Sequence, residues 1–291
     1  MYVATLLTDP ARPALAAETA ESLARDWGGG PLRWLAPGEA AEFGIEAMPE
    51  DLWDRWAGLQ VLGVDLAVQP AEGRRKRMLL ADMDSTMIGQ ECIDELADMA
   101  GVGERVKDIT ARAMNGELDF EGALTERVGL LAGLPETVID EVYAQRITMA
   151  PGGRQLIATM KAAGGHTALV SGGFTAFTTR VAADLGFDEH RANTLLAAEG
   201  RLTGAVARPI LGREAKIAAL EEITARLGLG VGDAVAVGDG ANDLGMLGLA
   251  GMGVALHAKP AVAAQCKIRI NHGDLTALLY LQGYERDEFA V

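Results

Sequence analysis

The sequence is poor in cysteine. It has only Cys92 and Cys266, too few for a disulfide framework, and no CxxC spacing that would favour a zinc or redox site. We therefore expect two reduced thiols and a cytoplasmic location. The N-terminus lacks a basic segment followed by an apolar run, and no apolar run is long enough to cross a bilayer, so neither a signal peptide nor a membrane partner is expected.

Positive charge is also scarce. The chain has 26 Lys and Arg against 41 Asp and Glu, which gives a formal net charge of −15. Such a chain repels nucleic-acid phosphates, and we expect no nucleic-acid partner. An anionic substrate would have to be attracted by local positive groups or by a bound cation, so the charge balance suggests a metal ion if the substrate is anionic.

Tryptophan is absent after residue 56, and this shift in composition marks the first ~70 residues as a separate unit. Residues 2–7 resemble a strand, and residues 14–27 have helical periodicity and end at three glycines. A strand at 32–35, a short helix at 49–56 and a strand at 61–68 complete a small α+β unit. Residues 69–77 are polar and basic, as expected of a linker.

From residue 78 onward, short apolar runs alternate with helical segments. The runs at 78–81, 167–170, 234–237 and 252–256 resemble buried strands, and helices are expected at 153–163, 175–185, 214–227 and 242–249. This alternation predicts an α/β fold with a Rossmann-like parallel sheet covered by helices. The region 91–145 shows only helical patterns, which suggests an inserted cap. We expect an N-terminal domain at 1–70 and a second domain at 71–291, with a core at 71–89 and 150–291 and a helical cap at 90–149.

Four polar sites follow the expected strands or the loops after them, where an open parallel sheet binds its ligands. The first is a D-x-D-x-T pattern with Asp82 and Asp84; the others are a Ser-Gly-Gly turn at 171–173, Lys216 in the first turn of a helix, and a glycine-rich G-D-x-x-x-D loop at 238–243. Taken singly, the first three also fit ordinary loop starters, a tight turn and a solvated lysine. The acidic loop is harder to explain as a simple turn, and its oxygen ligands suit Mg²⁺.

Together, in this order, the four sites resemble the motifs of the haloacid dehalogenase superfamily over about residues 78–281. Longer sequence segments resemble one branch of this superfamily, the phosphoserine phosphatases. These segments lie around Glu91, at 93–95, around Arg127, at 170–174 and at 237–243.

The resemblance implies a covalent phosphatase mechanism. Asp82 would attack phosphorus and become phosphorylated, and Asp84 would protonate the leaving oxygen and then activate water. Ser171 and Lys216 would complete the catalytic set by binding phosphate. Mg²⁺ would be held by Asp82, the Asp84 carbonyl, Asp239 and Asp243.

The resemblance also assigns recognition of free phosphoserine to the cap. Glu91 would bind the ammonium group and Arg127 the carboxylate, although Glu91 also fits a helix N-terminal acid and Arg127 a surface residue. Other small phosphomonoesters such as phosphohomoserine or phosphoethanolamine, phosphoryl transfer to an alcohol, and a silent metabolite sensor stay open. The further substrate-binding residues implied are Met114, Phe120, Ser171, Gly172, Gly173, Lys216 and Asn242.

The N-terminal unit is similar to the ACT-like extension of longer bacterial members of the family, by element order and position. A role in forming a homodimer or in binding an amino acid is one expectation, and a stabilising appendage is the other. The four histidines lack metal-ligand spacing. His257 and Lys259 are expected near the last strand end, close to the site.

Overall fold

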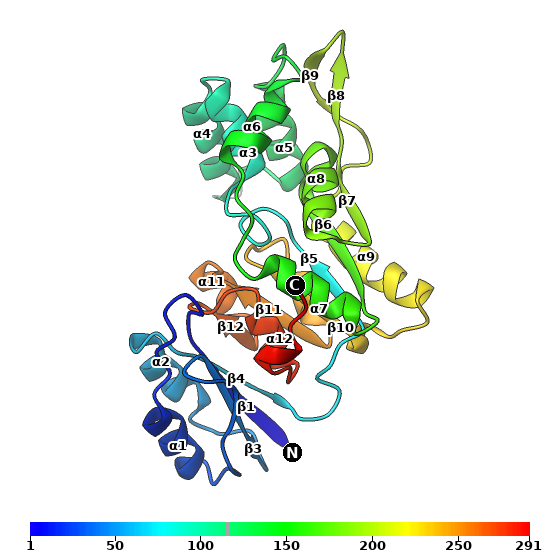
Figure 1. Cartoon of the computed structure of the whole chain (residues 1–291). Coiled ribbons are helices and arrows are strands. Elements are labelled where there is room, and N and C mark those ends of the chain that lie inside the picture. Colours follow the sequence, from blue (N-terminus) through cyan, green and yellow to red (C-terminus); the bar gives the residue numbers. More distant parts are fainter. Residues whose placement is uncertain (115–116) are drawn as a thin grey trace.

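The computed structural model describes residues 1–114 and 117–291. Figure 1 shows three regions along the long axis of the molecule: the N-terminal unit in blue, a central sheet with its helices, and a group of teal and green helices at the far end. Within the described residues, no helix has both the length and the apolar character needed to cross a membrane.

The N-terminal unit contains β1 (Tyr2–Leu7), α1 (Ala17–Asp26), β2 (Arg33–Ala36), β3 (Ala40–Ile45), α2 (Leu52–Val61) and β4 (Asp65–Pro70). Its strands form an antiparallel sheet in the order β2-β3-β1-β4, a ferredoxin-like arrangement. The expected strand at 61–68 began too early, because α2 continues to Val61 and Gly63 with a φ of 73° completes the turn after it. Strand β3 was not predicted, because Glu42 and Gly44 interrupt its apolar pattern.

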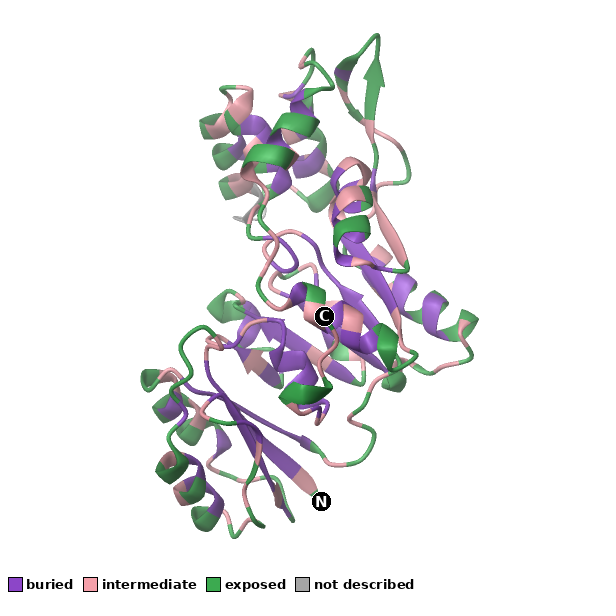
Figure 2. Ribbon diagram, viewed as in Figure 1, coloured by how far each residue is buried: buried purple, intermediate pink, exposed green. Residues whose placement is uncertain are grey.

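Both faces of this small sheet are buried. Leu6 packs with Leu23 of α1 and with Phe43 in one apolar cluster. The next residue, Leu7, points to the opposite face and belongs to the core of the larger unit, together with Tyr280. The N-terminal unit is therefore packed onto the rest of the chain, as the continuous purple strands of Figure 2 illustrate.

The central sheet has six parallel strands in the order β12-β11-β10-β5-β6-β7, which confirms the expected α/β fold. Strands β7 and β12 were not predicted, because β7 is polar and half-buried and β12 has only three residues. The strands are β5 (Met78–Ala81), β6 (His166–Phe174), β7 (Glu189–Asn193), β10 (Ala234–Gly238), β11 (Met252–Leu256) and β12 (Ile268–Ile270).

The helices of this unit are α7 (Gly153–Ala162), α8 (Thr175–Leu185), α9 (Arg213–Arg226), α10 (Leu244–Leu249), α11 (Pro260–Ala263) and α12 (Ala277–Leu281). Helix α10 begins two residues later than expected. The reason is local: the Asp243 carboxylate accepts the Gly240 N–H at 3.0 Å, so the preceding residues form a turn.

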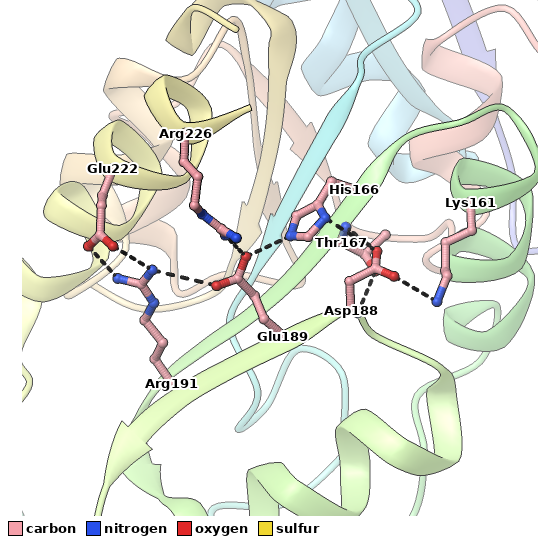
Figure 3. A network of polar contacts seen from close by, with 8 residues as sticks. All are labelled: Lys161, His166, Thr167, Asp188, Glu189, Arg191, Glu222 and Arg226. Carbon is pink, nitrogen blue, oxygen red and sulfur yellow. Dashed lines mark hydrogen bonds and ion pairs between the residues drawn. The ribbon is translucent and has the colours of Figure 1, made fainter. Parts of the chain in front are cut away.

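A polar network holds the edge strand β7 at the amino ends of the strands, away from the carboxyl edge (Figure 3). His166 Nε2 lies 2.6 Å from Glu189 Oε1, and Glu189 also pairs with Arg191 and with Arg226 of α9. Asp188 accepts the Thr167 N–H at 2.9 Å. The half-buried polar residues of β7 contribute little apolar packing. These hydrogen bonds and ion pairs therefore hold the strand to the sheet and to α9.

Four helices follow β5 and form the region expected to be a cap: α3 (Cys92–Met99), α4 (Gly103–Met114), α5 (Phe120–Gly129) and α6 (Val138–Arg146). An unpredicted hairpin of β8 (Leu195–Ala198) and β9 (Arg201–Val206) reaches out from the core segment and packs on α5 (Figure 1). The division into a core and a cap at the residue boundaries given above stays a prediction.

The chain enters and leaves the four-helix region at adjacent points. Ile88 and Met149 form an antiparallel bridge, and Gly89 donates its N–H to the Thr148 carbonyl at 3.0 Å. The Gln90 side chain bonds the Thr148 backbone N–H and the Thr148 hydroxyl, both at 2.9 Å. The two connections therefore form one hydrogen-bonded junction.

Candidate active site

Polar residues converge at the carboxyl edge of the central sheet. Asp82 follows β5, Ser171 lies in β6 on one side of it, and Asp239 follows β10 on the other. Between this edge and the cap helices lies a cavity of about 500 Å³. Its lining includes Asp82, Asp84, Glu91, Phe120, Arg127, Ser171, Gly172, Gly173, Asp239 and Asn242, all expected from the sequence.

Strand β5 delivers two carboxylates to this cavity. Asp82 continues the strand by donating its N–H to Val237 O at 3.0 Å. Met83 is fully buried, so the alternation of an extended chain turns the residues on either side, Asp82 and Asp84, towards the same space. Ser85 then adopts a φ of 55° and turns the chain away.

Lys216 lies behind Asp82 and is only 1% exposed. Its Nζ is 2.6 Å from Asp82 Oδ1 and 2.5 Å from Asp243 Oδ1. Burial disfavours the charged ammonium, but the ion pairs with Asp82 and Asp243 raise the pKa of Lys216 above its ordinary value. Lys216 is not part of the cavity lining, so its contacts are with the two carboxylates.

Three carboxylates crowd this site. Single oxygens of Asp82, Asp239 and Asp243 lie within 4.8 Å of one another. Burial, and next the charge of Asp243, raises the pKa of Asp239 to about 6. Both Asp243 oxygens are engaged, one by Lys216 and one by Gly240 N–H. A set of carboxylate oxygens in which the pKa values of Asp82 and Asp239 are raised by burial fits a small hard divalent cation, which would offset their repulsion.

Asp84 is held by the backbone and by the neighbouring strand. Its Oδ1 accepts the Cys92 N–H at 3.0 Å, and Ser171 Oγ lies 3.5 Å from Oδ2. Burial, and next the negative charge of Glu91, raises the pKa of Asp84 to about 7. Gly173 must stay without a side chain, since a Cβ there would lie 2.6 Å from Asp84 Oδ2.

The opposite wall of the cavity comes from the cap. Glu91 accepts the Ser85 hydroxyl at 2.8 Å, and Arg127 is half-buried with its Nε directed to Ala123 O at 3.3 Å. The Phe120 ring lies over the Ser-Gly-Gly turn, because a Cβ on Gly172 would approach Phe120 Cζ to 3.1 Å. Met114 ends α4, but its side chain lies outside the described residues.

Lys259, expected near the site, does line the cavity, and the cavity and its supports also include three residues that the sequence analysis did not assign to the site: Asp94, Thr110 and Asn193. Asp94 and Thr110 line the cavity from α3 and α4, and Lys259 lines it from the core. Asn193 is 2% exposed and donates to Gly172 O at 2.8 Å. Asp94 could have been found from the sequence, because it lies three residues after Glu91 and therefore on the same face of a helix. Asn193 could not, because nothing in the sequence distinguishes it from the other polar residues of β7.

The central part of the chain matches a known family. Haloacid dehalogenase-like hydrolases match residues 79–248, more than half of the 291-residue chain. The chain belongs to this family. This confirms the family resemblance, and the matched residues contain the D-x-D-x-T, Ser-Gly-Gly, Lys216 and acidic-loop sites described above.

Individual relatives agree with the family match. A phosphoserine phosphatase of Streptomyces coelicolor is 45% identical over 229 residues, covering 78% of this chain and 56% of the relative. A crystal structure of a family hydrolase from Salmonella enterica serovar Typhi has a TM-score of 0.86 at 30% identity and covers 99% of this chain and 100% of the other. A structure of a substrate-bound phosphoserine phosphatase has a TM-score of 0.66 at 41% identity, with 70% and 97% covered.

The chain spans 56%, 58% and 65% of the length of three curated phosphoserine phosphatases that it matches. The family and its hydrolase fold therefore follow directly from the comparisons. The substrate is argued next from the cavity.

Proposed function

We propose that this protein is a Mg²⁺-dependent phosphoserine phosphatase that hydrolyses O-phospho-L-serine to L-serine and phosphate, as in the last step of serine biosynthesis. One observation carries the proposal: a single cavity has the carboxylates of Asp82, Asp84 and Asp239 on its core wall and the opposite charges of Glu91 and Arg127 on its cap wall. Phosphoserine has a phosphate, an ammonium and a carboxylate, and the cavity offers a partner for each. The names of the curated relatives support the same substrate.

The reaction begins with attack by Asp82. Lys216 holds Asp82 Oδ1 at 2.6 Å and leaves the other carboxylate oxygen for phosphorus. The bond from phosphorus to the serine oxygen breaks, and Asp84 supplies the proton that this oxygen takes up. Asp84 then removes a proton from the water that hydrolyses the aspartyl phosphate. Ser171 Oγ and the N–H groups of the Ser-Gly-Gly turn bind the phosphate oxygens.

Mg²⁺ would be held by the Asp82 and Asp239 side chains and the Asp84 carbonyl, with Asp243 fixed beside them. When bound, the ion supplies positive charge that offsets repulsion between the carboxylates and the phosphate. Asp243 also forms an ion pair with Lys216, the same lysine that pairs with Asp82. A cytoplasmic location, a homodimer and amino-acid binding by the N-terminal unit stay predictions.

Phosphate release from L-phosphoserine, phosphohomoserine and phosphoethanolamine, each with Mg²⁺ and with EDTA, tests the proposal. We expect turnover only with Mg²⁺ and a clear preference for phosphoserine. Preference for another ester would overturn the assignment of Glu91 and Arg127 while leaving the catalytic core in place. No turnover of any ester would contradict the proposed enzyme and favour a sensor.

Removing the Arg127 charge should change substrate choice. In Arg127→Gln, kcat/KM for phosphoserine is expected to fall about 10- to 100-fold, since a bidentate partner of the carboxylate is lost. Phosphoethanolamine has no carboxylate, so its kcat/KM should change less than about threefold. The half-buried Arg112 of α4, which pairs with Glu126 and is not in the cavity lining, offers the control Arg112→Gln. Equal losses on both substrates would contradict carboxylate recognition.

Adding one methyl group at Gly173 should block catalysis. The new Cβ in Gly173→Ala would lie 2.6 Å from Asp84 Oδ2 and 3.0 Å from Ser171 Oγ, so both groups must shift. We expect kcat to fall about 100-fold or more, the effect of misplacing catalytic groups by about 1 Å. Gly129→Ala is a matched control, because nothing lies within 4 Å of its Cβ position. Steady-state kinetics and circular dichroism would show whether the loss occurs in a folded enzyme.

A further inference from the structure

Acidic side chains outnumber basic ones in the described lining of the cavity, so each basic group there bears on how a phosphate dianion is bound. Five carboxylates line it: those of Asp82, Asp84, Glu91, Asp94 and Asp239. In the part of the chain that the structure describes, the basic side chains in the lining are Arg127 and Lys259. Arg127 lies on the cap wall. The ammonium group of Lys216 is already paired with the carboxylates of Asp82 and Asp243. Besides the proposed Mg²⁺, Lys259 is therefore the basic side chain of the described lining that is available on the core side, where the phosphate must bind.

The position of Lys259 follows from the sheet. Strand β11 ends at Leu256 and lies between β10 and β12. The segment after it, residues 257–259, therefore emerges beside the loop after β10 that carries Asp239. Lys259 is the N-cap residue of α11, and its side chain makes no capping hydrogen bond.

This segment has an unusual backbone that needs support. His257 has a φ of 46°, in the left-handed region that non-glycine residues rarely occupy. Its N–H donates to Ile270 O at 2.7 Å, and its Nε2 lies 2.8 Å from Gly273 O, where it acts as the donor because a carbonyl can only accept. The direction in which Lys259 leaves β11 therefore depends on the turn at 271–273.

A residue of the N-terminal unit, Asp65, holds the turn at 271–273. Asp65, the first residue of β4, is completely buried. Its carboxylate accepts three consecutive backbone N–H groups, from Asn271 at 2.9 Å, His272 at 2.9 Å and Gly273 at 2.8 Å. Charge-assisted bonds of this kind are strong and directional. Figure 1 shows β4 and β12 side by side where the two units meet.

We propose that Lys259 contacts the phosphate of the substrate and that Asp65 is its positioning residue, acting through the 271–273 turn and His257. The inference deepens the proposed phosphatase function and rests on it. It gives the N-terminal unit a part in building the active site, in addition to any role in assembly.

Binding of inorganic phosphate in the presence of Mg²⁺, measured by calorimetry, tests the contact without relying on turnover. We expect Lys259→Gln to raise the dissociation constant about tenfold and Lys259→Arg to restore most of the affinity. In phosphoserine kinetics, Lys259→Gln should raise KM more than it lowers kcat. Unchanged phosphate affinity in Lys259→Gln would overturn the assignment even if the enzyme hydrolyses phosphoserine as proposed.

A double-mutant cycle tests the link to Asp65. Asp65→Asn alone should weaken phosphate binding about threefold to tenfold, but it should have no further effect in the Lys259→Gln background. Full additivity of the two effects would overturn the positioning role. His257→Asn keeps a residue that tolerates positive φ, removes the contact with Gly273, and should reproduce the effect of Asp65→Asn if that variant folds poorly.

Glu39→Gln is the matched control for the Asp65 variant. Glu39 is another buried acid of the N-terminal unit, and it bonds Tyr280 Oη at 2.8 Å and Arg286 Nη1 at 2.8 Å across the same interface. Among the described residues, its side-chain hydrogen bonds and ion pair go to Tyr280 and Arg286 and do not reach residues 257–273. Glu39→Gln should therefore lower the unfolding midpoint without changing phosphate affinity. A loss of phosphate affinity equal to that of Asp65→Asn would show that loosening the interface is sufficient, and would overturn the specific path.

Discussion

Replacing Asp82 by asparagine is expected to abolish turnover, with kcat reduced by about 10⁴-fold or more. The amide has the same size and can still accept the bond from Lys216, but it is a far weaker nucleophile than a carboxylate. The loss should appear in single-turnover phosphate release at saturating phosphoserine and Mg²⁺. Full turnover by Asp82→Asn would rule out the covalent mechanism.

Asp94→Asn provides the matched control for this prediction. Asp94 lines the same cavity, so its substitution removes the same charge from the same space. It has no part in the proposed bond-forming steps, and kcat should change by less than about tenfold. If Asp94→Asn were as inactive as Asp82→Asn, the effect would be one of cavity charge and not of nucleophilicity.

Replacing Lys216 by methionine is expected to harm both stability and catalysis. Methionine fills much of the same volume, but it leaves Asp82 and Asp243 buried without their shared cation. Removing one member of a buried ion pair typically costs about 3–5 kcal/mol of unfolding free energy. Since Asp82 also loses the donor that orients it, kcat should fall about 100- to 1,000-fold.

The stability loss should be measured by urea unfolding in EDTA, so that metal binding does not contribute. Lys161→Met is the control, because Lys161 also pairs with a carboxylate, Asp188, at 2.9 Å, but its side chain is 40% exposed. Exposed pairs contribute about 0–1 kcal/mol. Equal stability losses in the two variants would contradict the view that Lys216 compensates buried charge.

The convergence of Asp82, Ser171 and Asp239 on one cavity could be predicted from sequence because a parallel sheet brings the ends of its strands together. Asp82, Ser171 and Asp239 follow apolar runs that are unambiguous strands, and the carboxyl ends of such strands meet at one edge. The fold class followed from the same runs. Glu91 and Arg127 were accessible only through family resemblance, since nothing local distinguishes them from surface charges.

Other features depend on tertiary contacts that the local pattern does not encode. Strand β7 is polar and is held by ion pairs, between its Glu189 and Arg226 and between the preceding Asp188 and Lys161, so no hydrophobic alternation marks it. The Asp65 contact joins residues about 200 positions apart, and an aspartate at a strand start is indistinguishable in sequence from an ordinary turn residue. Lys216 was expected in the phosphate cradle, and that role stays a prediction, because its observed contacts are with Asp82, which lines the cavity, and with Asp243 behind it.

The junction at Ile88 and Met149 has a consequence for how such enzymes diversify. Because the chain leaves and re-enters the core at hydrogen-bonded neighbours, joining residues 89 and 148 directly would close only a short turn and cost little chain entropy. A helical segment of another length or sequence can be inserted at this point without changing the register of β5 or the placement of Asp82. If the helical region selects the substrate as proposed, we expect a chimera carrying a foreign helical segment to take its substrate preference from the donor and its catalytic carboxylates from the recipient.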